Sequence, residues 1–293
     1  MPAYFPTDLA YFDAQGADAA TFLQNLLSSQ ITHLPENGLS WSSFNTPKGR
    51  TLGIFLVWRI ENGFRLALPR DIAPGIVKKL RMYVLRSKVS LSEPVEQQLF
   101  ACLGSTNIQT LGEAIANMHW AQRDEGTYLA LSQEAYLLCT PTPPAGLEAD
   151  PHAFTQACIQ AGWPWVSTST QDLFIPQMLN LDLLEGVCFN KGCYPGQEVI
   201  ARTKYLGKLK KRTCRARAAS QEICPPGTEL FAPEFGEQAA GHVVLCAPHP
   251  AGGIQMLISA QISALEAQSL HLQHPEGPPL SIENLPYTPA SNA

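Results

Sequence analysis

A short segment around Cys193 holds the residues best suited to chemistry. The octapeptide Lys191-Gly192-Cys193-Tyr194-Pro195-Gly196-Gln197-Glu198 combines an ammonium, a thiol, an amide and a carboxylate. Its two glycines can adopt positive φ, and the proline ring fixes its own φ at about −65°. The segment is therefore predicted to be a shaped loop, a structure that often carries functional side chains when a rigid scaffold holds it.

Cys193 is the candidate nucleophile of this loop. Lys191 and the basic residues that follow would stabilise its thiolate, which is the reactive form of a cysteine. The alternative is an inert cysteine packed beneath Tyr194. The eight cysteines of the chain show neither a Cys-x-x-Cys pair nor the spacing of zinc ligands. We therefore expect no disulfide framework and no protein-bound metal.

A basic run follows the loop. Residues 191–217 contain nine of the 20 Lys and Arg residues against one carboxylate, Glu198. Such a run could attract an anionic partner, such as an RNA or an acidic protein. It could equally be the solvated outer face of a pair of strands. Because no aromatic RNA-recognition signature accompanies it, tRNA is expected as an indirect partner at most.

The whole chain reads as an ordinary globular protein. It has 293 residues, of which 45% are hydrophobic and 15% charged, and its formal net charge is −5. This length predicts two or three compact units. No apolar run is long enough to cross a bilayer, and the first residues lack the pattern of a signal peptide. These features favour a cytoplasmic protein that does not associate with membranes, and we expect a monomer.

The expected elements mix helices with antiparallel hairpins. Asn62-Gly63 is typical of a hairpin turn, and apolar residues at four-residue steps predict an amphipathic helix over 71–85. Asp150 and Pro151 are typical of a helix start. After residue 212 short strands broken by Pro and Gly indicate a small β-module, and the tail from Pro275 is expected to be irregular. Further helices and strands are predicted at 17–27, 53–60, 64–68, 127–131, 135–139, 213–218, 241–246, 254–262 and 269–273.

Several segments resemble the signature of the folate-binding YgfZ proteins, bacterial tRNA-modifying proteins that share the fold of the glycine-cleavage T-protein, an aminomethyltransferase. The octapeptide is the most specific match. The others are Ile175–Asp182, Phe189-Asn190, Ala201-Arg202 and, more weakly, 16–19, 22–24, 48–50, 83–89 and 161–164.

The resemblance implies an α+β fold with a ring-like arrangement, a ferredoxin-like unit and a C-terminal β-barrel. Residues 1–212 would form the folate-binding region, with two interleaved subdomains, and residues 213–293 the small barrel and the tail. The implied function is to bind tetrahydrofolate and to support synthesis or repair of iron–sulfur enzymes, including those that modify tRNA. Partners would then be folate and iron–sulfur enzymes or their assembly proteins.

The resemblance also implies roles for individual residues. Cys193 and Lys191 would be the reactive pair. Gln177 and Asn180 carry amides suited to a flat heterocycle such as a pterin, although a buried amide can equally satisfy backbone groups. The further candidate cofactor contacts are Phe154, Tyr194, Gln197, Glu198 and Arg202. For Gln197 and Glu198 a role in orienting the loop is an equal alternative, and Glu198 could simply neutralise Arg202.

Two positions depart from the related patterns. Aminomethyltransferases carry an acidic pair where this chain has Leu52 and Gly53, so whether the protein is an enzyme stays open. The folate-binding pattern also has aromatic residues that contact folate. Phe154 falls at one of these positions, but the other falls near Ala10, where this chain has no large ring. The alternatives are a folate-dependent aminomethyltransferase or demethylase, and an RNA-binding adaptor that does not use folate.

Overall fold

The computed structural model describes residues 2–287 and divides the chain into two compact units. The first unit comprises residues 1–45, 52–154 and 185–195, and the second comprises 46–51, 155–184 and 196–293. The chain therefore passes from the first unit to the second between Pro195 and Gly196, inside the octapeptide. The boundary predicted at residue 212 stays a prediction; the sheet of the second unit begins beside it, at Lys211.

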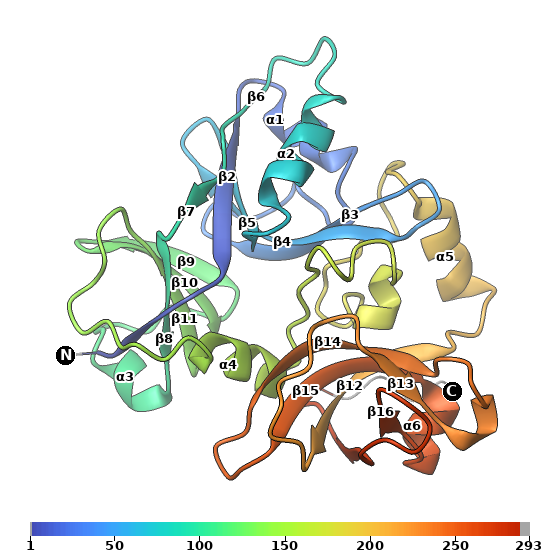
Figure 1. The fold of residues 1–293 in the computed structure, drawn as a ribbon. Coiled ribbons are helices and arrows are strands. Elements are labelled where there is room, and N and C mark those ends of the chain that lie inside the picture. The colour runs from blue at the N-terminus through green and yellow to red at the C-terminus, as the bar shows by residue number, and fades with distance from the viewer. Residues whose placement is uncertain (1, 288–293) are drawn as a thin grey trace. The chain divides into compact units, whose positions relative to one another are not determined.

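A helix-backed antiparallel sheet forms the larger part of the first unit (Figure 1). Its strand order is β3-β4-β5-β2-β6, and β7 also pairs with β2. The strands are β2 (Leu9–Gln15), β3 (Leu39–Asn45), β4 (Thr51–Ile60), β5 (Gly63–Pro69), β6 (Ser90–Leu91) and β7 (Val95–Glu96). The helices α1 (Ala19–Gln24) and α2 (Ala73–Arg81) pack on one face of this sheet.

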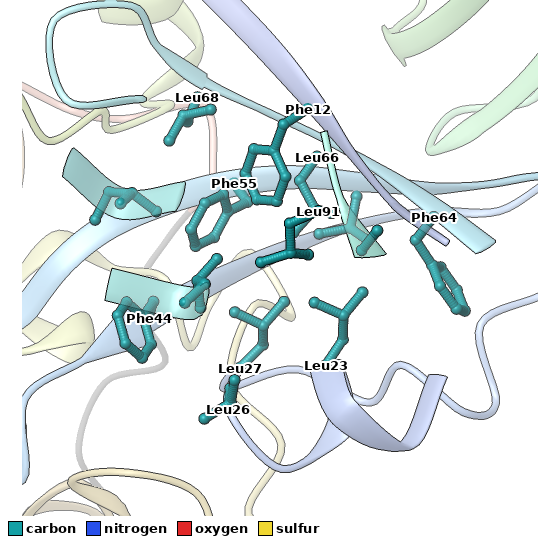
Figure 2. Close-up of a cluster of buried hydrophobic side chains, with 14 of the residues drawn as sticks. Phe12, Leu23, Leu26, Leu27, Phe44, Phe55, Phe64, Leu66, Leu68 and Leu91 are labelled. Carbon is teal, nitrogen blue, oxygen red and sulfur yellow. The ribbon is translucent and has the colours of Figure 1, made fainter. Parts of the chain in front are cut away.

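The core of this layer is aromatic and aliphatic (Figure 2). Phe12, Phe55 and Leu66 point from the sheet toward Leu23 and Leu27. Leu23 lies in α1, and Leu27 follows shortly after the C-terminal end of this helix. Phe12 and Phe55 meet edge to face, with their ring centroids 6.3 Å apart. Complete burial of each such side chain contributes about 1.5–3 kcal/mol, so this core fixes the segments that border it.

A second antiparallel sheet completes the first unit, in the order β1-β8-β11-β10-β9. Its strands are β1 (Tyr4–Pro6), β8 (Leu99–Leu103), β9 (His119–Arg123), β10 (Gly126–Ser132) and β11 (Ala135–Cys139). The short helix α3 (Ser105–Gln109) packs on it through Ile108. The buried hydroxyls of Tyr4 and Tyr128 form a 2.7 Å hydrogen bond within this core.

The second unit is built on a six-stranded sheet, a half-barrel in the order β16-β13-β14-β15-β12-β17. Its strands are β12 (Lys211–Ala218), β13 (Glu229–Phe231), β14 (Gly241–Pro248), β15 (Ile254–Gln261), β16 (His271–Leu272) and β17 (Ser281–Glu283). The helical elements that accompany it are α4 (Ala153–Ala161), η1 (Pro176–Leu179), α5 (Gln197–Tyr205), η2 (Pro233–Phe235) and α6 (Ile262–Ala267).

Most predicted elements are confirmed, with shifted ends. Ile60 pairs with Gly63 across a hairpin turn in which Asn62 takes a left-handed φ of 58°. One prediction is wrong: the tail after Pro275 contains the strand β17, which pairs with β12. A strand of three residues is too short for sequence periodicity to indicate it. Glu283 of β17 lies 2.6 Å from Arg217 and so compensates positive charge along β12. Residues 288–293 of that tail lie outside the described part.

Candidate functional site

The loop that carries Cys193 is anchored inside the first unit by Lys191. The Lys191 Nζ donates hydrogen bonds of 2.7 Å to the carbonyl oxygens of Leu27 and Ser29, just after α1. Ser28 holds the preceding part of the loop, because its hydroxyl donates to the carbonyl of Gly186 at 2.6 Å and its carbonyl accepts the Cys188 N–H at 2.8 Å. Residues separated by some 160 positions in the sequence thus fix the base of the loop.

Burial changes the electrostatics of Lys191. Desolvation lowers the pKa of its ammonium to about 8, and the nearby Cys188 partly opposes this shift. The ammonium also lies 5.2 Å from the ring centroid of Tyr194, within the range of a cation–π contact. The sequence predicted that Lys191 would stabilise the thiolate of Cys193, and this stays a prediction. The partners of Lys191 in the structure include Cys188, two carbonyls and the Tyr194 ring.

Cys193 lies at the exposed part of the loop. Of the eight cysteines it alone is exposed, and Gly192 beside it is exposed as well. Tyr194, in contrast, is buried. The alternative in which Cys193 is packed beneath Tyr194 is therefore wrong, while its reactivity stays a prediction. A thiol in this position is accessible to a reaction partner, while Lys191 and Tyr194 are held by the protein.

Tyr194 and two polar side chains of the first unit hold buried atoms that lack partners. Burial raises the pKa of the Tyr194 phenol above its ordinary value. Among residues 2–287, its hydroxyl, the Ser29 hydroxyl and the side-chain oxygen of Asn45 have no hydrogen-bond partner. Since an unsatisfied buried polar atom costs roughly 1–3 kcal/mol, such atoms mark places where water or a polar ligand would bind.

Asn45 also takes part, through its amide nitrogen, in a buried polar network that the sequence did not reveal. The Ser43 hydroxyl donates to that of Ser28 at 2.9 Å, and the Asn45 amide donates to the Ser43 hydroxyl at 3.0 Å. Ser28, Ser43 and Asn45 are at most 1% exposed. The one signal that could have pointed to them is a run of small polar residues in β3, where a buried strand would ordinarily carry Val, Ile or Phe.

Gly196 lies directly before α5, at a point where backbone segments pack closely. It takes a left-handed φ of 81°, and a Cβ added to it would lie 2.5 Å from both the Gly49 Cα and the Thr46 carbonyl oxygen. A larger residue does not fit there. Of the predicted cofactor contacts on α5, Gln197 is half-buried, whereas Glu198 and Arg202 are exposed. No ion pair joins the latter two in the described part of the chain.

Gln177 and Asn180 lie at η1 in the second unit and have different surroundings. The Gln177 amide donates to the carbonyl of Ile200 at 2.6 Å, but its side-chain oxygen is buried without a partner in the described chain. The Asn180 amide is used within the fold: it donates to the carbonyl of Thr213 at 2.9 Å and accepts the Thr213 N–H at 3.3 Å. Gln177 is therefore the better equipped of the two for a ligand.

Arg212 and Asp182 support this region with a bidentate ion pair. The two Arg212–Asp182 bonds measure 2.7 and 3.0 Å, and the aspartate side chain is 6% exposed. The same guanidinium donates to the backbone carbonyl of Gln177 at 2.9 Å. Removal of either charged partner would leave a buried charge uncompensated.

A groove of about 600 Å³ opens beside this ion pair, within the second unit. Its charged lining comes mainly from the basic run identified in the sequence. The lining residues are Gln177, Asp182, Thr203, Lys204, Gly207, Lys208, Leu209, Lys210, Arg212, Gln261, Ile262 and Ser263.

The predicted site residues thus divide between the units. Cys193, Lys191, Tyr194 and the buried Phe154 belong to the first. The other candidates, Gln177, Asn180, Gln197, Glu198 and Arg202, belong to the second. Within residues 2–287, no three His, Cys, Asp or Glu side chains are grouped as metal ligands, and no helix is long and apolar enough to cross a membrane.

Comparison with known proteins adds the family. No family model matches the chain. A Haemophilus influenzae protein of uncharacterised function is 30% identical over 227 residues, which is 76% of each chain. The tRNA-modifying proteins YgfZ of Sodalis glossinidius and Shigella boydii are 25% and 26% identical, and each alignment covers 96% of this chain and 91% of the relative.

The fold has a counterpart of known structure. Aminomethyltransferase T of the glycine cleavage system from Bartonella henselae superposes with a TM-score of 0.75 over 97% of this chain and 85% of that protein, at 14% identity. The predicted α+β, T-protein-like fold is confirmed. With the octapeptide around Cys193, the relatives and this fold, the chain belongs to the YgfZ family.

Proposed function

We propose that the protein binds tetrahydrofolate and supports the synthesis or repair of iron–sulfur enzymes, including those that modify tRNA, with Cys193 as its reactive thiol. The observation that carries this proposal is the contrast within the loop: Cys193 is exposed, whereas Lys191 and Tyr194 on either side are anchored or buried. An inert cysteine would need no such support. Relatives named tRNA-modifying proteins agree with this role.

The residues present fit a reduced pteridine. A pterin offers several N–H donors and ring acceptors on one edge, and the protein supplies buried polar atoms that lack partners. Within the first unit, Tyr194 offers a hydroxyl donor, Asn45 offers an amide oxygen as acceptor, and Ser29 offers a hydroxyl that can do either. Phe154, buried at the start of α4, adds apolar surface. Tetrahydrofolate would supply a carrier for one-carbon units.

The chain's own residues then have separable tasks. Lys191 holds the loop through the carbonyls of Leu27 and Ser29. Gly196 fixes the point at which the loop enters α5. Cys193 presents the nucleophilic sulfur to a partner, which we take to be an iron–sulfur enzyme or an assembly protein. On this proposal the protein acts as a cytoplasmic monomer.

Two measurements test the two halves of the proposal. Isothermal titration with tetrahydrofolate should give saturable binding, and Tyr194→Phe should weaken it about three- to tenfold because one hydrogen bond is lost. Tyr205→Phe removes a hydroxyl from an exposed tyrosine and serves as the matched control. Absence of saturable binding by the unaltered protein would refute the cofactor assignment.

The thiol is tested separately. Cys193→Ser should fold and bind tetrahydrofolate as the unaltered protein does, but should not restore iron–sulfur enzyme activity in a bacterial strain that lacks its own YgfZ. Cys246→Ser, a half-buried cysteine in β14, is the control and should complement. Full complementation by Cys193→Ser would remove the thiol from the mechanism and leave the folate assignment standing.

A further inference from the structure

We propose that the second unit binds one soft monovalent metal ion of the copper(I) type through the sulfur atoms of Cys224, Cys246 and Met256. We call these three residues the sulfur cluster. All three belong to the second unit, and the proposal does not depend on folate binding or on Cys193, which belongs to the first.

Adjacent strands place two of the three sulfur atoms. Cys246 of β14 lies directly opposite Met256 of β15, its antiparallel neighbour (Figure 1). Residues opposite one another in such a pair have their Cβ atoms about 4.5–5.5 Å apart and their side chains on one face of the sheet. Met256 is fully buried, and the half-buried Cys246 packs against the same apolar core. The thioether and the thiol therefore lie side by side.

A turn brings the third sulfur atom to this face. Cys224 immediately precedes the turn at 225–228, which is tied to β14 because the Gly227 N–H donates to a carbonyl of that strand at 2.8 Å. The buried Cys224 sulfur lies 3.7 Å from the Met256 sulfur. The Cys224 thiol also forms a hydrogen bond with Cys246. Two thiols and a thioether are thus gathered from a loop and two strands.

The spacing of these atoms suits a three-coordinate metal. A bond between a metal ion and a thiolate is about 2.3 Å long, so three such bonds in one plane place the sulfur atoms about 4 Å from one another. The separation of 3.7 Å between the Cys224 and Met256 sulfurs is close to this value. A small movement of the side chains is therefore enough to admit the ion.

The chemistry of the donors selects copper(I) over zinc. Thiolates and thioethers are soft ligands, which favour Cu(I). Structural zinc sites instead use four ligands from Cys, His, Asp and Glu, and within residues 2–287 no third side chain of these types completes such a group. Binding displaces the protons of the ligating thiols into solvent and transfers no electron, so it needs no oxidant or reductant. Cysteine spacing does not indicate this site, because a methionine supplies one of its ligands.

The test is anaerobic titration of the full chain with Cu(I) in competition with bathocuproine disulfonate. The titration uses a Cys193→Ser parent, because an exposed thiol would bind copper by itself. One tightly held Cu(I) per chain is expected. Loss of outer-shell partners already weakens metal sites about 10–100-fold, so Cys224→Ser and Cys246→Ser should each weaken binding about 100-fold or more. Met256→Leu, which nearly conserves volume, should weaken it about tenfold.

X-ray absorption by the bound copper separates ligation from a merely structural role. The parent should show three sulfur ligands and Met256→Leu two. The matched controls are Cys214→Ser, which removes another half-buried thiol packed against the same core, and Met178→Leu, which makes the same change in η1. Both controls should keep the affinity of the parent.

Three results would overturn the proposal: no stoichiometric binding by the parent, an equal loss of affinity in the controls, or zinc bound as tightly as Cu(I). Because the sulfur cluster is separate from the loop of Cys193, Cys246→Ser should lose copper affinity and still complement the strain that lacks YgfZ. Failure of the copper site would therefore leave the proposed function standing.

Discussion

Replacement of Lys191 by methionine tests how the loop of Cys193 is held. Lys191→Met keeps the length of the side chain but removes two 2.7 Å hydrogen bonds to the carbonyls of Leu27 and Ser29. Hydrogen bonds from charged donors contribute about 1.5–3 kcal/mol each, and the cost of burying the ammonium offsets part of this. We expect the free energy of unfolding at pH 7 to fall by about 1–3 kcal/mol.

The pH dependence of that difference gives the sharper result. The pKa of Lys191 falls from 10.5 to about 8 on folding because of burial. Between these values the unfolded chain binds more protons than the folded one, so stability rises with pH. The cost of burying the ammonium is fully present below pH 8 and is gone above about pH 10.5. A shift of this size corresponds to at most roughly 3 kcal/mol. Partial solvent exposure reduces it to about 1–2 kcal/mol.

Urea unfolding of both proteins at pH 7 and pH 10 measures this effect. The unaltered protein should exceed Lys191→Met in stability by about 1–2 kcal/mol more at pH 10 than at pH 7. Comparison with Lys78→Met, which removes an exposed lysine of α2, accounts for the general loss of one charge. A stability difference that stays constant or shrinks as the pH rises would refute the buried-ammonium explanation.

Three further predictions concern the surroundings of the loop. Brief treatment with iodoacetamide should alkylate Cys193 before the four buried cysteines, as peptide mass spectrometry would show; slower labelling of Cys193 would contradict its exposure. Gly196→Ala should cost about 2–4 kcal/mol in chemical unfolding because its Cβ meets backbone at 2.5 Å, whereas Gly192→Ala, with no atom within 4 Å, should be nearly neutral. Arg212→Met should lower the free energy of unfolding by about 3–5 kcal/mol, and the loss should largely disappear when Asp182 is also replaced by asparagine; purely additive losses would argue against the pair.

Local sequence patterns predicted the elements that local forces determine. The hairpin at Asn62 and the helix α2 follow from a turn residue and from a four-residue apolar repeat. The loop of Cys193 was likewise predicted from its glycines and proline. The exposure of Cys193 excludes its packing beneath Tyr194, which the sequence had left open.

Contacts between distant segments could not be predicted. The partners of Lys191 are main-chain carbonyls 162 and 164 positions away, and carbonyls leave no trace in residue types. The buried Ser28–Ser43 pair is equally invisible, because serine is ordinarily a surface residue. The groove beside Arg212 was not predicted. The charges of the basic run were evident, but only the fold separates Lys208 and Lys210 at the groove from the arginines that face Glu283.

The discontinuous first unit has a consequence for protein synthesis. Residues 185–195 belong to it although 30 intervening residues, 155–184, belong to the other unit. On a ribosome that adds roughly 5–20 residues per second, the stretch ending at Phe154 would wait about two to eight seconds for Pro195 to be added. During that interval the Ser28 hydroxyl and the carbonyls of Leu27 and Ser29 have no loop to bind. The nascent chain would therefore leave these polar groups without their partners until residues 185–195 are made and pack against them.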